Sequence, residues 1–188
     1  MKKLSALILA LALLVSVIPA AYAANATPNT TTLTTTVPSA TYVLNIPADQ
    51  TITFGKTETH IGNVTVTDST NFAEGKNVDV TVEYAPFAAE AAEISTTIPY
   101  QLWQMAKVSG GQVSRSIASG KKMTFEGKSD GTVAELTKFT ATEGVGTGIG
   151  KTYTMDNLIV KINSTDWGKA LAGNYKSTIT FTSEIVAK

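Results

Sequence analysis

Cysteine is absent from this chain of 188 residues. Its absence excludes disulfide bonds, and it also excludes a lipid anchor attached through a cysteine thiol. The folded protein must therefore rely on its apolar core alone. For an exported domain of this size, that pattern is ordinary in bacteria and unusual in eukaryotes.

Charge and histidine are both scarce. Charged residues make up 16% of the chain, and 15 basic residues balance 15 acidic ones. A balanced chain lacks the clustered positive field that nucleic acids and anionic membranes require, so no nucleic-acid partner is expected. The single histidine, His60, cannot by itself form a metal site or a catalytic triad. The sequence therefore predicts no metal and no cofactor, and His60 is interpreted as a partly exposed strand residue.

The N-terminal residues have the pattern of an export signal. Lys2 and Lys3 precede an apolar run from Leu4 to Ile18, and Ala21-Tyr22-Ala23 is a small-x-small cleavage motif. A run of about 15 apolar residues is typical of a signal peptide and short for a membrane span. We expect residues 1–23 to be removed, leaving a secreted or cell-surface protein with no membrane contact. A retained signal anchor is the alternative.

A Thr- and Pro-rich arm, residues 24–40, follows the signal. Its composition is that of a flexible linker. Leu33, Thr35 and Val37 nevertheless stand at alternate positions, which share one face of an extended strand. The arm could therefore also form a strand. Both interpretations remain open from the sequence.

Residues 41–188 alternate apolar and polar positions in short runs separated by Gly, Asn and Asp turns. The cleanest alternation covers Val78–Tyr84. Ile98–Met105 is apolar on both parities, as in a strand covered on both faces. About eight to ten short strands with such turns predict an all-β domain, an antiparallel two-sheet Ig-like or fimbrial-type sandwich.

Two short helices are also predicted. Pro86 stands at the first position of a helical pattern ending near Ile94. Ser164, Thr165 or Asp166 could cap a second helix that ends at Gly173. We expect both to cap an open end of the sandwich. Residues 132–139 receive no assignment.

The stretch Gly144–Tyr153 comes close to a phosphate-binding loop. Gly150-Lys151-Thr152 supplies the end of that motif, but Val145 occupies the position of its first glycine. The residues that follow are strand-like, whereas a phosphate loop leads into a helix. The glycines therefore predict a hairpin or surface loop.

No other residues form a convincing catalytic constellation. A glycosidase needs two carboxylates across a cleft. Asp79 with Glu83, and Glu90 with Glu93, are instead interpreted as solvated surface pairs, so we expect no enzyme. The aromatic residues are assigned mainly to the core. Trp103 is the candidate ligand-facing aromatic, because it has apolar neighbours on both faces of the expected strand and is therefore the least certain member of the core.

The segment "DWGKALAGNYKSTITFT", from Asp166 to Thr182, has an Ala172-Gly173-x-Tyr175 turn before an alternating final strand. This ending resembles that of bacterial exported β-sandwich proteins, which include fimbrial subunits, spore-coat U-like domains and surface Ig-like modules. The resemblance implies a structural or adhesive role at the cell surface.

Strand addition is the physical route to such a role, because an unpaired sheet edge accepts an extended segment from a neighbour. The candidate donor is Asn29–Ser39, with Leu33 and Val37 as anchors and Thr35 between them. The terminal strand, Tyr175–Ile185, is then expected inside the sandwich. The alternative is a secreted monomer that binds a glycan or a protein. The expected partners are accordingly other copies of the chain, other surface proteins or glycans.

Overall fold

The computed structural model describes residues 33–73 and 75–188. Its contacts divide the chain into two units, Met1–Thr36 and Val37–Lys188. The expected signal peptide and the first part of the arm lie outside the described residues. Everything below concerns the second unit, unless the arm is named.

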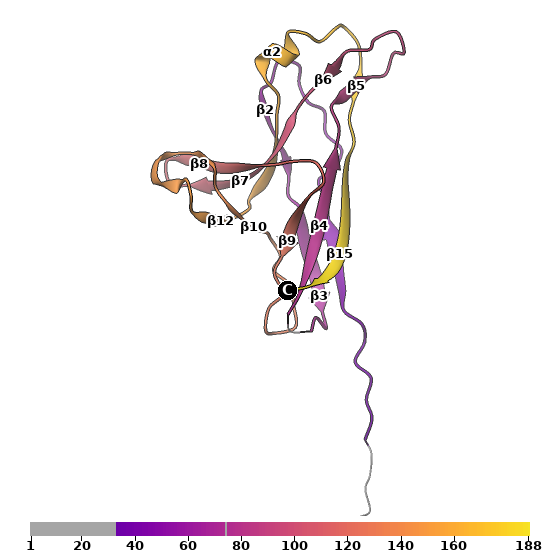
Figure 1. Cartoon of the computed structure of the whole chain (residues 1–188), viewed down its shortest axis with the longest axis vertical. Coiled ribbons are helices and arrows are strands. Elements are labelled where there is room, and N and C mark those ends of the chain that lie inside the picture. Colours follow the sequence, from indigo (N-terminus) through magenta and orange to yellow (C-terminus); the bar gives the residue numbers. More distant parts are fainter. Residues whose placement is uncertain (1–32, 74) are drawn as a thin grey trace, which may run out of the picture. The chain divides into compact units, whose positions relative to one another are not determined.

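The first sheet has three antiparallel strands in the order β15-β4-β9 (Figure 1). They are β4 (Lys76–Tyr84), β9 (Lys121–Phe125) and β15 (Ile179–Ala187). The predicted alternation in β4 is confirmed, since Val78, Val80 and Val82 are completely buried while the residues between them face outward. On the outward face, Lys122 reaches both Asp79 and Glu184, with nitrogen–oxygen distances of 3.4 Å and 2.6 Å.

The second sheet has five antiparallel strands in the order β11-β8-β7-β13-β2. Its members are β2 (Glu58–Gly62), β7 (Gln101–Val108), β8 (Gly111–Ile117), β11 (Glu143–Gly144) and β13 (Asn157–Lys161). The hairpin of β7 and β8 projects to the side in Figure 1, carrying β10 and β12 with it.

Strand β7 is buried on both faces, as its sequence predicts. Leu102 and Ala106 belong to the main core, to which both sheets contribute residues. Trp103 and Met105 face the other way and form a small second cluster with Ile159 of β13. This arrangement explains why the segment is apolar on both parities.

The main core joins both sheets and stabilises the unit. It combines Val80 and Phe125 of the first sheet with Leu102 and Val160 of the second. Burial of this apolar surface is the dominant favourable term in folding, and in a chain without cysteine no covalent cross-link supplements it.

Smaller elements complete the unit. The first pair is β1 (Thr41–Asn45) with β3 (Thr65–Thr70), and the second is β10 (Lys138–Thr140) with β12 (Thr152–Thr154). A further sheet contains β5 (Phe87–Ala89), β6 (Thr97–Ile98) and β14 (Tyr175–Lys176). The helical pieces are the 3₁₀ turn η1 (Gly146–Gly148) and the four-residue helix α2 (Ser164–Trp167).

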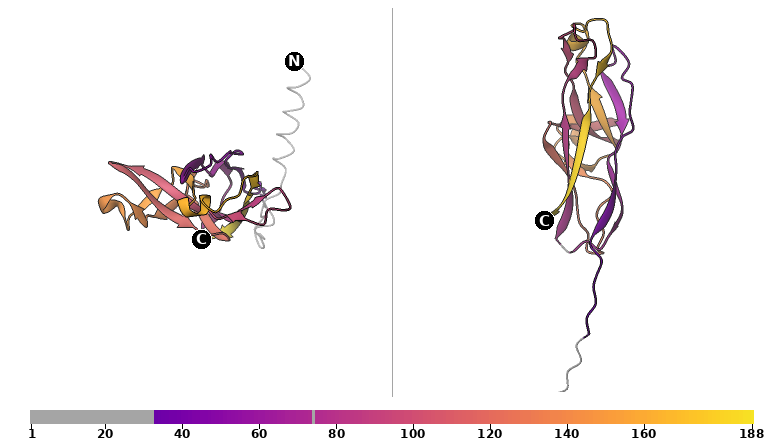
Figure 2. Two further views of the ribbon diagram at one scale, coloured as in Figure 1. Left: turned by 90° about the horizontal axis from the view of Figure 1, so that it is seen from above. Right: turned by 90° about the vertical axis from the view of Figure 1, so that its right-hand side faces the viewer.

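The two ends of the unit differ in what they carry. Helix α2 and the β5–β6 pair lie at one end, which we call the tip (Figures 1 and 2). At the other end, Thr41 pairs with Thr70, and the amide of Lys188 donates to the carbonyl of Gly75. Because the arm joins the unit here, we call this the arm end.

The helix predicted from Pro86 to Ile94 is wrong. Phe87–Ala89 is strand β5, which pairs with β6 on one side and β14 on the other. Cross-strand pairing with sequence-distant residues overrides the helical propensity of the alanines here. The four-residue α2 falls within the other predicted helix, and its Trp167 is buried.

The expectation of an interior terminal strand is also wrong. Strand β15 lies at the edge of its sheet and pairs only with β4 among the described residues. Its inward side chains, Ile179 and Phe181, are half-buried. The all-β, antiparallel class of the domain is confirmed, with very little helix among the described residues.

No helix within residues 33–73 and 75–188 is both long enough and apolar enough to cross a membrane.

Truncating the core should test the packing of the two sheets. Phe125 of β9 is fully buried between them. We expect Phe125→Ala to lower the free energy of unfolding by about 3–5 kcal/mol in urea denaturation. Thr182→Ala on the outward face of β15 is the control, expected within about 0.5 kcal/mol of the parent. Equal effects of the two substitutions would contradict this packing.

Candidate functional site

Two cavities that share lining residues lie along one side of the unit. The inner cavity has a volume of about 510 Å³ and the tip cavity about 710 Å³. Both are lined by Gln50, Ile52, Phe87 and Tyr175. We call the two together the side groove.

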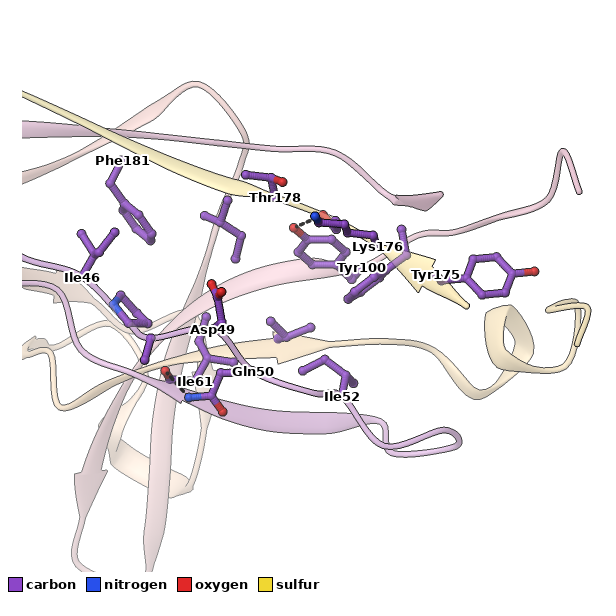
Figure 3. A pocket seen from close by; sticks show the side chains of 16 residues that line it. Ile46, Asp49, Gln50, Ile52, Ile61, Tyr100, Tyr175, Lys176, Thr178 and Phe181 are labelled. Carbon is purple, nitrogen blue, oxygen red and sulfur yellow. Dashed lines mark hydrogen bonds between the residues drawn. The ribbon is translucent and has the colours of Figure 1, made fainter. Parts of the chain in front are cut away.

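The side groove runs between β15 and the segment that leads from β1 to β2 (Figure 3). Residues 46–52 of that segment form no strand. Within the described part of the chain, none of their backbone groups makes a backbone–backbone hydrogen bond. The opposite wall is the edge of β15 that β4 leaves unpaired. Two backbone segments with free hydrogen-bonding capacity therefore face one cavity.

The inner cavity opens onto the main core. Ile179 and Phe181 reach it from β15, while Ile61 and Val160 reach it from the second sheet. Ile46 stands at its rim and is 53% exposed. Figure 3 shows Ile46 and Phe181 toward one end of this cavity, with Ile52 and Tyr100 further along. The floor of the groove is thus the side of a hydrophobic core that no strand covers.

Tyr100 forms a rigid aromatic wall of the inner cavity. Its ring stacks on Tyr84 with 5.1 Å between centroids and tilts against Phe87 at 5.0 Å. Its hydroxyl lies 3.0 Å from Ser177 Oγ, which itself donates to the carbonyl of Ala85. The Tyr100 hydroxyl is therefore the donor to Ser177. Burial raises the pKa of the Tyr100 phenol, and nearby Tyr84 adds to the rise, whereas a hydrogen bond that the Ser177 hydroxyl donates to the ionised phenolate opposes it.

The tip cavity is aromatic as well, with Trp167 of α2 buried in its wall. The indole Nε1 of Trp167 donates to the carbonyl of Lys56 over 2.8 Å. Phe54 packs edge-on against this indole at 5.3 Å and is 73% exposed. Leu171 is also exposed, and its backbone groups bond with the hydroxyl of Tyr175. Two large exposed apolar side chains, Phe54 and Leu171, thus border the tip cavity.

The charged residues of the side groove are few and exposed. Asp49 and Lys176 border the inner cavity, and Glu90 borders the tip cavity. The walls and floor are otherwise neutral, with apolar and hydroxyl groups. Such a site suits an uncharged, extended segment rather than an ionic ligand.

The three arm residues named from the sequence are exposed and lie in a segment without regular secondary structure. Leu33 is 90% exposed and Val37 is 70% exposed, with Thr35 exposed between them. Whether the arm enters a groove of another copy stays a prediction.

Trp103 is placed away from the side groove, on the opposite face of the second sheet. It is only 6% exposed, and its Nε1 donates to Gln101 Oε1. Lys161 Nζ lies 4.1 Å above the ring and also 3.6 Å from Glu143. A ligand would have to displace Lys161 to stack on this indole.

The remaining sequence candidates lie apart from one another. The stretch that resembles a phosphate loop leads into strand β12, as predicted. Gly144 has a packing reason, since a Cβ there would overlap the backbone of Gln112 and Val113. His60 lies exposed on β2, 3.6 Å from Glu58.

The two carboxylate pairs do not face each other across a cleft. Asp79 on the outward face of β4 accepts a hydrogen bond from Thr124. Glu83, Glu90 and Glu93 are exposed. Within the residues that the structure describes, no group of three or more His, Cys, Asp or Glu side chains is arranged to hold a metal ion.

Sequence reasoning missed the wall formed by residues 46–54. It treated these residues only as part of the alternating runs and turns of residues 41–188, and that pattern did not point to a binding surface. One signal was available, because Ile46, Ile52 and Phe54 share a parity across a segment interrupted by proline. A proline lacks the amide that a central strand would need.

Comparison of the chain with protein-family models, with curated proteins and with solved structures finds no match.

The pKa of Tyr100 predicts an alkaline loss of stability. The unfolded tyrosine loses its proton near the ordinary pKa of 10.0, whereas the buried phenol still holds it. The contribution of this pKa difference to the free energy of unfolding is fully present below pH 10.0, and it is lost as the pH rises through the pKa of the folded protein. We expect Tyr100→Phe to lose less stability than the parent between about pH 8 and about pH 11 in urea denaturation.

Thr182→Ala, which changes no titrating group and lies outside both cavities, is the control and should keep the parent's alkaline dependence. An unchanged pH profile in Tyr100→Phe would contradict the inferred burial of the phenol.

Proposed function

We propose that this protein is a secreted, non-catalytic structural or adhesive protein of the cell surface, and that it assembles by strand addition. The proposal includes an Ig-like two-sheet sandwich as the scaffold and removal of residues 1–23 on export. A short charge-poor chain without cysteine, beginning with the export pattern described above, supports this assignment.

One observation carries the proposal. Within the described part of the chain, residues 46–52 and the outer edge of β15 are unpaired backbones on either side of a cavity that opens onto the apolar core. An added strand would satisfy backbone groups on both sides and cover the exposed part of the core. Main-chain hydrogen bonds would supply affinity, and the cavities would select the side chains.

The arm is the donor that the chain itself offers. Leu33, Thr35 and Val37 alternate with Thr34 and Thr36, so an extended arm presents a mostly apolar face and a polar face. The segment is uncharged, like the floor of the side groove. Its two large apolar side chains are exposed in the single copy, and insertion would bury them.

A second candidate function rests on Phe54, whose exposed ring stands beside Trp167 at the tip. The protein would then be a secreted monomer that binds a glycan or an exposed apolar side chain of another surface protein there. The two candidates differ in whether the purified chain, lacking residues 1–23, polymerises.

A pair of double substitutions separates the two candidates. We expect Leu33→Asp with Val37→Asp to raise the concentration required for polymers by about a hundredfold or more, because two carboxylates would have to enter an apolar cavity. Thr34→Asp with Thr36→Asp adds the same charge on the other face of the arm and should polymerise nearly as the parent does. Light scattering and electron microscopy measure the outcome.

Two results would count against strand addition. A parent chain that stays monomeric at all concentrations would favour the tip-binding monomer. Polymers that form equally well with both double variants would show that the apolar face of the arm plays no part.

A further inference from the structure

We infer that the arm of one copy enters the side groove of the next copy at the tip and runs antiparallel to β15, giving a polar head-to-tail fibre. The inference deepens the proposed function and rests on it, because it names the occupant of the groove, its direction and the cavity for each anchor. It follows from the directions of the strands within Val37–Lys188.

The two walls of the groove run in opposite directions. Strand β15 begins at Ile179 opposite Tyr84 and ends at Ala187 opposite Lys76, so it descends from the tip to the arm end. Strand β1 starts at the arm end, and its continuation reaches the tip cavity at Phe54. An inserted strand must therefore be antiparallel to one wall and parallel to the other.

The place where the arm joins the unit decides between the two directions. It joins at Thr41, at the arm end, while the tip cavity, with the exposed side chains of Phe54 and Leu171, lies at the other end. When two copies stack end to end, the donor's arm end faces the acceptor's tip. Residues nearer the N-terminus of the arm then lie deeper in the groove, so the donated strand ascends toward the tip while β15 descends.

With this direction, the donated strand pairs in the antiparallel orientation with β15, the wall of the groove that is a regular strand. Antiparallel pairing is slightly more stable for each residue than parallel pairing, and here it falls on β15. The irregular wall, residues 46–52, receives the parallel side. An arm folded back into its own groove would enter from the arm end, and its N-terminal residues would lie nearer the tip. It would therefore run parallel to β15, which also begins near the tip.

The direction also assigns each anchor to a cavity. Leu33 and Val37 are four residues apart, which is about 13 Å in an extended strand. With the arm entering at the tip, Val37 lies in the tip cavity and Leu33 lies in the inner cavity beside Phe181. With the arm entering from its own side, the two assignments exchange.

The absence of cysteine allows a direct test, since introduced thiols have no background. The donors are Leu33→Cys and Val37→Cys. The acceptors are Ile46→Cys at the inner cavity and Leu171→Cys at the tip cavity, both exposed positions that should tolerate the change. Each acceptor thiol is first activated as a mixed disulfide, and each donor is mixed with each acceptor as a separate protein lacking residues 1–23.

We expect Leu33→Cys to couple to Ile46→Cys, and Val37→Cys to couple to Leu171→Cys. Both pairs should give at least about ten times the yield of the exchanged pairs, because docking raises the effective thiol concentration. Ile185→Cys, exposed on β15 and lining neither cavity, is the control acceptor. Non-reducing gels and peptide mass mapping identify the products.

Preference for the exchanged pairs would overturn the head-to-tail direction while leaving strand addition intact. So would a monomeric disulfide formed by one chain that carries both Leu33→Cys and Leu171→Cys. Yields no higher than those of Ile185→Cys in samples that do polymerise would place the arm outside the side groove. A parent chain that never polymerises would instead overturn the proposed function itself.

Discussion

Unsatisfied backbone along the side of an apolar core is the constraint on which this account depends. Among residues 33–73 and 75–188, residues 46–52 have no backbone–backbone hydrogen-bond partner, and the facing edge of β15 pairs with no strand. A buried N–H or C=O group without a partner costs roughly as much as a lost hydrogen bond, so such groups stay in water or acquire a partner. In the single copy the groove keeps them accessible, and an added strand would pair them.

The chemistry of the groove agrees with a backbone-driven contact. Its floor is the side of the main core, its walls are extended, and its few charged groups stand exposed at the border. Tyr100 and Ser177 stiffen the inner wall through a hydrogen bond that continues to Ala85. A wall that is already held in place favours recognition of an extended segment, because the wall itself loses little conformational entropy when the segment binds.

Much of the scaffold could be predicted from the sequence, since alternation depends on local burial. The alternation of Val78, Val80 and Val82 identified β4, and the two-faced apolar run identified β7. Pairing partners are not encoded locally, and for that reason Phe87–Ala89 was misassigned to a helix. An alternating apolar and polar sequence such as that of β15 occurs both in edge strands and in central strands of a sheet with one face in solvent. The position of β15 in its sheet could therefore not be deduced from its sequence. The side groove lies where residues 46–52 form no strand beside an edge of β15, and a local residue pattern does not reveal which sheet edges stay unpaired.

Amide hydrogen exchange of the polymer tests the central claim most directly. The account predicts slower exchange for those amides of residues 48–52 and 178–182 that point into the side groove and not toward β4. They should exchange at least about tenfold more slowly in polymers than in the chain lacking residues 24–39, since each of them gains a backbone partner. Amides on the outward hairpin of β7 and β8 should not change. Polymers in which residues 48–52 and 178–182 exchange as fast as in the truncated monomer would contradict strand addition at the side groove.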